Sequence, residues 1–415
     1  MQRPHHVIVT TFWSYKDALI QNCTLPYLKI MHQYLPVGSK IFLLTTEKPH
    51  FSIDKQERSV IRHYLSQWNI VHRSFPYYPY GWRSFLNWMR IVFRLLLDAW
   101  LYRVKYIHTF CPPAGISAYL LSVLSGATLV LDCYEPHAEA SVENQDWQRN
   151  SFRFRLLFWL EKLQSRRARY VLSNTAGMKE YARQKYGVEF PHFCVRPNCT
   201  NLEQFSEKNI KKPELLAKYG FENKIVAVYA GKFGGIYLKK EFFDLLKVAH
   251  QYWGEQFRVL ILTPHPKQEV EQMAAESALD SRIITSLFAP PQLVPDLMGL
   301  GDFGITPVKP VPTKRYCSPV KDGEYWALGL PVIIPQGIGE DAEIIARYHI
   351  GAVLAELSPA AYKQAIAQID RLLQGDRAAL RKKIRQIAYQ YRGFHIAEKA
   401  YAQVYQQHPS NDNLP

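Results

Sequence analysis

A glycine-rich turn between an expected strand and an expected helix is the first feature of this 415-residue sequence that could bind an anion. It lies in the segment YAGKFGGIYLKKE, from Tyr229 to Glu241, with the helix expected to begin near Leu238. Glycine lets backbone amides approach a ligand closely, the N-terminal end of a helix attracts negative charge, and lysines add point charges for a diphosphate. The candidate residues are Gly231, Gly234, Gly235, Lys232, Lys239 and Lys240. A plain tight turn is the alternative, because the pattern is neither GxGxxG nor a Walker loop.

A second candidate is the segment SPVKDGEYWALGLPVIIP, from Ser318 to Pro335. It predicts a loop, a short helix from about Lys321, a glycine stop at Gly329 and a strand. Glu324 falls in the first turn of that helix, where its carboxylate can accept two hydrogen bonds from vicinal hydroxyls such as those of a ribose. The alternative is that Glu324 only complements the helix dipole.

A third candidate lies in LDCYEPHAEA, where a strand leads into a loop that bears Glu135, His137 and Glu139. Histidine can gain or lose a proton near neutral pH, so His137 is a candidate for catalysis, with a capping or surface role as the alternative. The loop after the first expected strand carries Phe12, Trp13 and Tyr15. These rings predict either an acceptor pocket or simple packing beneath the loop.

The elements that must position these residues follow a rhythm of short apolar runs and longer helical patterns. The expected strands are HVIVTT, KIFLLTT, YIHTF, TLVLDCY and YVLSN, and then KIVAVYAG, FRVLIL, RIITSL, FGITPV and PVIIP. This alternation is typical of βαβ units with a parallel sheet, and its restart predicts two doubly wound α/β domains. Ligands bind at the carboxyl ends of such strands, which is where the three candidate segments lie.

The domain boundaries are predicted from the change in composition. Residues 1–205 form the first domain, the polar stretch 206–223 is a linker with a short helix, and residues 224–390 form the second domain. Beyond about residue 358 the pattern is helical. Residues 391–415 are expected to form a helix that packs back on the first domain, followed by a frayed tail.

The segment from Ser318 to Pro335 resembles the donor-binding signature of retaining GT-B glycosyltransferases of the group 1, or family 4, type. Other blocks are similar to that family in order and spacing: YVLSNTAGM at 170–178, VRPNCTNLEQF at 195–205 and SLFAPPQLVPDLMGLGDFGITP at 286–307. The resemblance covers nearly the whole chain and is densest from 170 to 340. It implies a GT-B fold, in which two Rossmann-like domains face each other across a cleft.

The resemblance also implies roles for single residues. A glutamate at the position of Glu324 binds the donor ribose, and basic residues at Lys232 and the Lys239/Lys240 pair contact the diphosphate. A histidine at the position of His137 contacts the transferred sugar. The signature and the preceding block place further donor contacts at Leu287, Ser318, Pro319, Val320 and Lys321. The family has another glutamate where this chain has Tyr316, so the identity of the sugar stays open.

The expected chemistry is transfer of a sugar through an oxocarbenium-like state, with negative charge growing on the departing phosphate. The sequence has no DxD motif, so lysines and helix amides are expected to replace a divalent metal ion, and no cofactor is expected. The resemblance implies retention of configuration. If the product is inverted instead, Glu135 or Glu139 becomes the candidate general base.

Composition bounds the partners. Hydrophobic residues at 47% and charged residues at 21% fit a folded globular chain rather than a disordered one. The net charge of +15 is uneven, with 25 Lys+Arg against 14 Asp+Glu in residues 1–206. This bias suits a polyanion, an anionic membrane surface or a phosphorylated substrate, or serves solubility alone. The absence of a nucleic-acid motif argues against nucleic acid.

Two basic, aromatic helical segments, at 81–106 and 151–170, suit either an anionic leaflet or the core of an α/β domain. The first residues read as a strand and not as a signal peptide, and charges interrupt every long apolar run. The six cysteines show neither a metal-ligand nor a disulfide spacing. The expected location is therefore cytoplasmic, with peripheral attachment at the inner face of the plasma membrane.

These observations predict a glycosyltransferase that moves a sugar from a nucleotide-sugar donor to a lipid-linked or saccharide acceptor, in cell-surface polysaccharide or glycolipid synthesis. Two alternatives stay open at this point. One is a nucleotide-sugar epimerase or hydrolase on the same fold, and the other is a GT-B protein that binds without catalysing a reaction.

Overall fold

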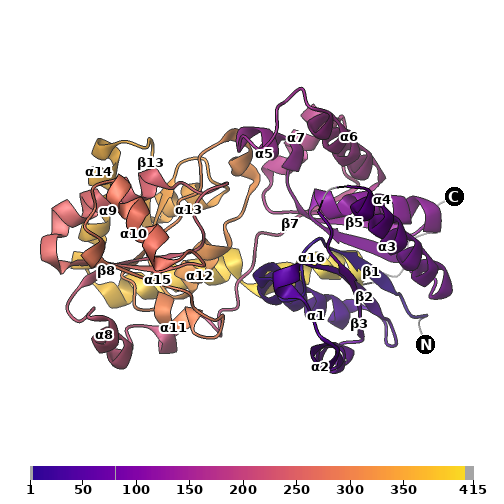
Figure 1. Cartoon of the computed structure of the whole chain (residues 1–415), viewed down its shortest axis with the longest axis horizontal. Helices are drawn as coiled ribbons and strands as arrows, with labels where there is room; N and C mark the ends of the chain where they lie inside the picture. The colour runs from indigo at the N-terminus through magenta and orange to yellow at the C-terminus, as the bar shows by residue number, and fades with distance from the viewer. Residues whose placement is uncertain (1–2, 80, 407–415) are drawn as a thin grey trace. The chain divides into compact units, whose positions relative to one another are not determined.

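The computed structural model describes residues 3–79 and 81–406 and divides into two compact units. The first unit contains residues 1–197 and 395–415, and the second contains residues 198–394. Each unit is built on one parallel β-sheet, so the prediction of two doubly wound α/β domains is confirmed (Figure 1). None of the helices within the described residues is long and apolar enough to span a membrane.

The sheet of the first unit has seven strands in the order β3-β2-β1-β4-β5-β6-β7. The strands are β1 Val7–Thr10, β2 Ile41–Glu47, β3 Ile70–Pro76, β4 Tyr106–Phe110, β5 Thr128–Tyr134, β6 Tyr170–Ser173 and β7 His192–Val195. The helices are α1 Leu25–Tyr34, α2 Lys55–Ser66, α3 Trp82–Leu101, α4 Pro112–Ser125, α5 His137–Glu143, α6 Phe152–Arg167, α7 Gly177–Tyr186 and α16 Phe394–Tyr405. The central strands are buried on both faces, which explains their continuous apolar runs.

The sheet of the second unit has six strands in the order β10-β9-β8-β11-β12-β13. The strands are β8 Ile225–Ala230, β9 Phe257–Leu262, β10 Ile284–Leu287, β11 Phe303–Ile305, β12 Val332–Pro335 and β13 Gly351–Leu354. The helices are α8 Pro213–Tyr219, α9 Lys240–Trp253, α10 Lys267–Glu276, α11 Val294–Met298, α12 Val320–Ala327, α13 Asp341–Tyr348, α14 Pro359–Gln374 and α15 Arg377–Arg392. Short helical turns complete the two units: η1 Ile20–Thr24, η2 Pro49–Phe51, η3 Glu207–Asn209, η4 Gly254–Gln256, η5 Ser281–Ile283 and η6 Pro312–Tyr316.

Strand β8 shows how the sequence builds a core on both faces of the second sheet. Val226 and Val228 pack into one buried cluster together with residues of α12, α13 and α15. Ala227 and Tyr229 pack into a second cluster with residues of α9, α10 and α14. Successive side chains of a strand point to opposite faces, so an unbroken apolar run requires helices on both sides.

The observed junction lies eight residues before the predicted end of the first domain (205 against 197) and 26 before the predicted start of the second (224 against 198). The chain leaves the first unit after Pro197, whereas the prediction placed this point after residue 205. Residues 206–223, predicted as a linker, lie within the second unit, where Phe221 is buried in the core and Leu215 and Leu216 of α8 pack against it. The apolar residues of this short helix therefore serve the second core.

The last helix belongs to the first unit. Within α16, Tyr401 donates a hydrogen bond to Asp132 at 2.6 Å, and the hydroxyl of Tyr405 lies 2.6 Å from Nδ1 of His108. Both tyrosines are buried, so these contacts fix α16 against the first sheet. Most of the tail predicted to fray, residues 407–415, lies outside the described residues.

Candidate active site

In the second unit the glycine-rich segment forms a loop at the carboxyl edge of the sheet, between β8 and α9. Tyr237 makes antiparallel bridges to Gly234 and to Val308, which follows β11. The backbone N–H of Leu238 donates to the carbonyl of Pro307 at 2.7 Å. The loop is therefore attached to the segment after the neighbouring strand.

The backbone on either side of Lys232 is held in place. Its carbonyl accepts a hydrogen bond from the Tyr229 hydroxyl at 2.6 Å, and the next N–H, that of buried Phe233, donates to Nε2 of His265 at 3.1 Å. Gly234 and Gly235 have φ of 82° and 59°, in the left-handed region that glycine adopts without strain. Lys232 is exposed, and its ammonium group has no ion pair within the described residues.

The other two lysines of the loop differ from Lys232. Helix α9 begins at Lys240, two residues after the predicted start. The Lys239 ammonium lies 3.0 Å from a carboxylate oxygen of Glu276, and the Lys240 ammonium lies 2.7 Å from one of Asp244. The charges of Lys239 and Lys240 are thus paired with carboxylates. Of the three predicted phosphate-binding lysines, Lys232 is the one without an ion pair in the described part of the chain.

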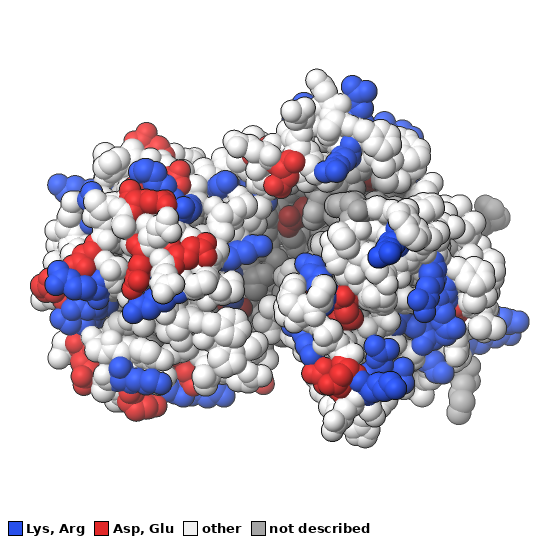
Figure 2. Space-filling view, viewed as in Figure 1, with Lys and Arg blue, Asp and Glu red and all other residues white. Residues whose placement is uncertain are grey.

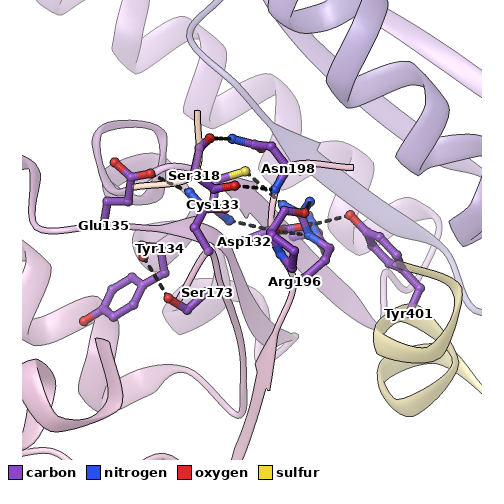
Figure 3. Close-up of polar contacts among 12 residues, drawn as sticks. Asp132, Cys133, Tyr134, Glu135, Ser173, Arg196, Asn198, Ser318 and Tyr401 are labelled. Carbon is purple, nitrogen blue, oxygen red and sulfur yellow. Dashed lines mark hydrogen bonds and ion pairs between the residues drawn. The ribbon is translucent and has the colours of Figure 1, made fainter. Parts of the chain in front are cut away.

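The segment from Ser318 to Lys321 is fastened before α12 begins. Asn198 donates to Ser318 twice, from its backbone N–H to the hydroxyl at 3.1 Å and from its side-chain amide to the carbonyl at 2.6 Å (Figure 3). The guanidinium of buried Arg392 also donates to the Ser318 hydroxyl, at 2.5 Å. Pro319 is the N-cap of α12, with an extended backbone, and Val320 is the first residue of the helix.

Glu324 is the fifth residue of α12, beyond the first turn in which it was predicted, and only 4% of its surface is exposed. One carboxylate oxygen is 2.6 Å from the ammonium of Lys321, one helical turn earlier. The hydroxyl of the next residue, Tyr325, accepts the backbone N–H of Ala230 at 3.3 Å. The helix that carries Glu324 and the glycine loop therefore meet at the same edge of the sheet.

The remaining predicted donor residues lie around this edge. Leu287 is the last residue of β10 and packs partly against the core, and Tyr316 ends the short helix η6. In the first turn of α12, burial and the nearby Asp341 raise the pKa of Asp322 well above its usual range. The Thr306 hydroxyl donates to this carboxyl group. Asp322 therefore belongs to the support of α12.

In the first unit, the segment after β5 places His137 as the first residue of α5. Nδ1 of His137 lies 3.1 Å from the carbonyl of Glu135, and this contact fixes the orientation of the ring. The carboxylate of Glu135 accepts a hydrogen bond from the Asn174 amide at 2.5 Å. Both side chains are half-buried at the carboxyl edge of the first sheet.

Glu139, the other acidic residue of this segment, is buried and bound to its neighbours. It accepts a hydrogen bond from Tyr181 at 3.0 Å and forms ion pairs with Lys185 at 3.3 Å and Arg149 at 3.7 Å. These contacts link α5 to α7. Glu135 is the less constrained of the two carboxylates that the sequence offered as a general base.

Glu161 on α6 supports the start of α5 from below. Its carboxyl group accepts the backbone N–H of Ala138 at 2.9 Å and a hydrogen bond from Tyr186 at 2.8 Å. Complete burial raises the pKa of Glu161 to about 8. The residue that follows His137 is thus held by a carboxyl group that stays protonated at neutral pH.

Replacing Glu161 with Gln is expected to flatten the dependence of stability on pH. The native state holds this proton up to about pH 8 whereas the unfolded chain releases it near its ordinary value of 4.5. Between these values wild-type stability therefore falls as pH rises, by at most about 1.4 kcal/mol per pH unit from this group. Glutamine keeps an acceptor for Ala138 and loses no proton.

Melting temperatures measured at pH 5 and pH 8 check this. The Glu161→Gln variant should match the wild type at pH 5 and exceed it at pH 8, and the exposed Glu189→Gln should track the wild type at both. Equal slopes for wild type and Glu161→Gln would contradict the assignment.

A buried polar network that sequence reasoning missed lies directly beneath the candidate acceptor segment (Figure 3). Arg196 donates to Oδ1 of Asp132 from two nitrogens, at 2.9 and 2.5 Å, and Tyr401 donates to Oδ2 at 2.6 Å. Burial alone would raise the pKa of Asp132, but Arg196 and the hydrogen bonds from His108 and Tyr401 outweigh it and hold the pKa well below its usual range. The network joins β4, β5 and the segment after β7 to α16.

The aromatic residues after β1 divide between packing and exposure. Tyr15 is buried, its ring centroid lies 5.0 Å from that of His72, and burial raises its pKa to about 12. Trp13 is half-buried and contacts the exposed Phe12 at 5.0 Å between ring centroids. Backbone contacts fix the loop to β2, including the N–H of Thr46 to the carbonyl of Trp13 at 3.1 Å. Trp13 is therefore better placed than Tyr15 to meet a ligand.

Comparison with known proteins agrees with this architecture. Residues 47–199 match the family described as glycosyl transferase 4-like domain. Sucrose-phosphate synthase from Thermosynechococcus elongatus aligns with a TM-score of 0.69 at 15% identity, over 98% of this chain and 99% of its own. Anabaena HepE in complex with UDP-glucose aligns with a TM-score of 0.69 at 15% identity, over 97% of this chain and 99% of its own.

A third similar structure is WaaG, a glycosyltransferase involved in lipopolysaccharide biosynthesis, with a TM-score of 0.68 at 13% identity, over 97% of this chain and 100% of its own. The curated proteins contain no match to the chain. At these identities the structural likeness establishes the fold. The chain therefore has the two-domain α/β fold of GT-B glycosyltransferases, and its residues 47–199 match a glycosyl transferase 4-like domain.

Proposed function

We propose that this protein transfers a sugar from a nucleotide-sugar donor to a lipid-linked or saccharide acceptor, with retention of configuration and without a metal ion. The observation that carries the proposal is the pairing, at one edge of the second sheet, of the buried Glu324 with a glycine loop that carries Lys232. A carboxylate for vicinal hydroxyls beside amides and an ammonium group for a diphosphate is the polarity pattern of a nucleoside diphosphate.

Similar proteins support the choice of donor and pathway. The HepE structure holds UDP-glucose, and WaaG takes part in lipopolysaccharide biosynthesis. We therefore extend the proposal to cell-surface polysaccharide or glycolipid synthesis at the inner face of the plasma membrane. His137, at the start of α5, is the proposed contact to the transferred sugar, and Trp13 and Glu135 are the proposed acceptor-side contacts.

The proposed chemistry follows from the charges available. As the bond to the departing phosphate breaks, negative charge grows on the leaving oxygen, and the Lys232 ammonium and the loop amides stabilise it. The leaving phosphate then accepts the proton of the acceptor hydroxyl on the same face. The departing group thereby acts as the base, so no carboxylate is required for this step.

A thermal-shift screen with UDP, GDP, ADP, CDP and their sugars tests the donor assignment. A nucleotide that binds only the folded state raises the melting temperature, by an amount that grows with concentration over Kd. The nucleotide sugar that gives a shift is then supplied with acceptor lipids and with EDTA, and the anomer of the product is read by NMR. Retention and activity in EDTA are expected.

Each other outcome has a distinct meaning. If no nucleotide shifts the melting temperature, the donor site is wrong and a non-catalytic role gains ground. Release of nucleotide without an acceptor would identify the hydrolase alternative, and conversion of the donor into an epimeric nucleotide sugar would identify the epimerase alternative. An inverted product would replace the leaving-group mechanism with general-base catalysis by Glu135.

A further inference from the structure

An arginine-lined cavity in the first unit has no part in the candidate donor site. It has a volume of about 420 Å³ and lies between α2, β3 and α3. Its walls carry two arginines from α2, one from β3 and two from α3, namely Arg58, Arg62, Arg73, Arg90 and Arg94. No carboxylate is among the described residues that line it. Figure 2 shows Lys and Arg side chains gathered over this part of the unit, at the lower right of the view.

Two of these arginines share a single counter-ion. The buried carboxylate of Asp98 lies 2.7 Å from Arg73 and 3.3 Å from Arg94. Arg58, Arg62 and Arg90 have no ion pair within residues 3–79 and 81–406. Three like charges without a counter-ion around one cavity repel each other, and an anion in that cavity relieves the repulsion.

The pKa of a neighbouring histidine also reflects the positive charge of these arginines. His72 lines the cavity, and burial together with the charges of Arg58 and Arg62 lowers its pKa to about 4. It is therefore neutral at physiological pH. The surplus positive charge in the cavity belongs to the arginines alone.

The cavity continues to the carboxyl edge of the first sheet. A second hollow of about 440 Å³ shares Arg58, Ser74 and Arg90 with it and reaches the ends of β2 and β3 at Glu47 and Pro76. That edge also carries the loop after β1 and the start of α5. An anion bound by the arginines would therefore lie at the same carboxyl edge of the first sheet as the candidate acceptor contacts.

Next to the arginines, α3 exposes an apolar stripe, which the buried Leu96 interrupts before Trp100. It consists of Trp82, Phe85, Leu86, Met89, Phe93 and Trp100, all exposed. Their spacing of i, i+3, i+4, i+7, i+11 and i+18 places them along one side of the helix. Trp82 and Phe93 have 69% and 63% of their surface exposed, whereas Ile91 and Leu95 on the opposite face are buried. Arg90 and Arg94 follow along the flank of the stripe.

We propose that this surface binds a phosphate-bearing anionic lipid in a membrane, with Arg58, Arg62 and Arg90 holding the headgroup phosphate and the stripe of α3 inserted among the acyl chains. A free phosphate gives the stripe no partner, and an apolar protein surface gives the arginines none. An anionic lipid monolayer supplies both. This inference rests on the proposed function and adds an anionic membrane as the partner of the first unit. Because lipid binding is measured without a donor, the lipid site and the proposed sugar transfer can be refuted separately.

Flotation with vesicles tests the arginines. Vesicles of phosphatidylcholine with 30% phosphatidylglycerol should bind the wild type, and vesicles of phosphatidylcholine alone should bind it far less. The triple variant Arg58→Gln/Arg62→Gln/Arg90→Gln should lose about 100-fold in partition coefficient, from the usual contribution of a basic residue near an anionic surface. The control Arg155→Gln/Arg166→Gln/Lys179→Gln removes the same charge from α6 and α7 and should lose far less. Equal losses would mean diffuse charge attraction and would overturn the site.

A second pair of variants tests the apolar stripe. Phe85→Ser/Phe93→Ser should lower binding to the anionic vesicles at least tenfold, and Phe152→Ser/Trp159→Ser, which alters exposed residues of α6, should leave it close to the wild type. A larger loss from the α6 pair would move the membrane contact to that helix. All of these side chains are exposed, so unchanged melting temperatures are expected and confirm that the variants fold.

The source of the phosphate is tested with soluble glycerol 1-phosphate. Millimolar glycerol 1-phosphate should neither raise the melting temperature appreciably nor displace the protein from anionic vesicles. If it binds as tightly as the vesicles do, and the arginine triple variant abolishes that binding, the cavity is a site for a small soluble anion and the lipid assignment is wrong.

Discussion

Replacing Lys232 with Met is expected to lower kcat by about 100-fold or more with little change in the KM for the donor, from the usual cost of removing one group that stabilises a developing oxyanion. The reason is the timing of the charge. A diphosphate that is already bound is shared among loop amides and water, whereas the extra negative charge appears only as the glycosidic bond breaks. An ammonium group directed at that charge contributes mainly to the transition state.

The structure offers matched controls for this prediction. Lys383 on α15 is exposed and has no ion pair in the described part of the chain, so Lys383→Met removes an equivalent charge away from the loop. Lys239→Met removes a charge that Glu276 already neutralises, and it should cost far less than Lys232→Met. Steady-state kinetics with the donor found in the nucleotide screen check the order of the three. If Lys239→Met is the most damaging, the roles within the loop must be exchanged.

The sequence predicts every central strand of the two sheets but only one of the four edge strands, β10. The three strands that it did not reveal are β3, β7 and β13, and each lies at an edge of its sheet. Central parallel strands are covered on both faces and show continuous apolar runs, whereas β3 contains His72, Arg73 and Ser74, and β7 is partly exposed throughout. In β3 and β7 these polar or exposed residues remove the apolar pattern on which the prediction rests. The four residues of β13, GAVL, are apolar and mostly buried, and this run is too short to stand out in the sequence.

In the candidate site, contacts between residues close in the sequence could be predicted, whereas contacts between residues far apart in the sequence could not. Glu324 and its Lys321 partner are three residues apart, so a local motif can reveal them. The ion pair of Asp132 with Arg196 spans 64 positions, and its contact with Tyr401 spans 269. One signal was present, since an aspartate inside the apolar run TLVLDCY requires a buried partner. The identity of that partner depends on the fold.

The arginine cavity is also invisible in the linear sequence. Arg58, Arg73 and Arg90 belong to three different elements, and each alone reads as an ordinary surface charge. The basic bias of the first half was visible, but composition does not distinguish scattered charges from a cluster. Only the packing of α2 and α3 beside β3 brings these arginines together around one cavity.

Replacing Glu324 with Gln is expected to raise the donor KM by about 10- to 100-fold, since a hydrogen bond to a charged acceptor contributes about 1.5–3 kcal/mol. Glutamine has the same shape and keeps one acceptor oxygen, but it cannot accept from both hydroxyls of a ribose. The exposed Glu343→Gln on the neighbouring helix α13 is the matched control and should leave the KM unchanged. Kinetics at saturating acceptor measure both.

The ribose assignment itself needs a test that loss of activity does not provide, because Glu324 also pairs with Lys321 and its removal could disturb α12. A 2′-deoxy donor supplies it. The wild type should discriminate against the deoxy donor about 10-fold or more in kcat/KM, by the cost of one lost charge-assisted hydrogen bond, and Glu324→Gln should discriminate several-fold less. A general disturbance of the helix would weaken both donors equally and leave the ratio intact. The loss of discrimination therefore separates a carboxylate that binds the sugar hydroxyls from one that only complements Lys321 and the helix dipole.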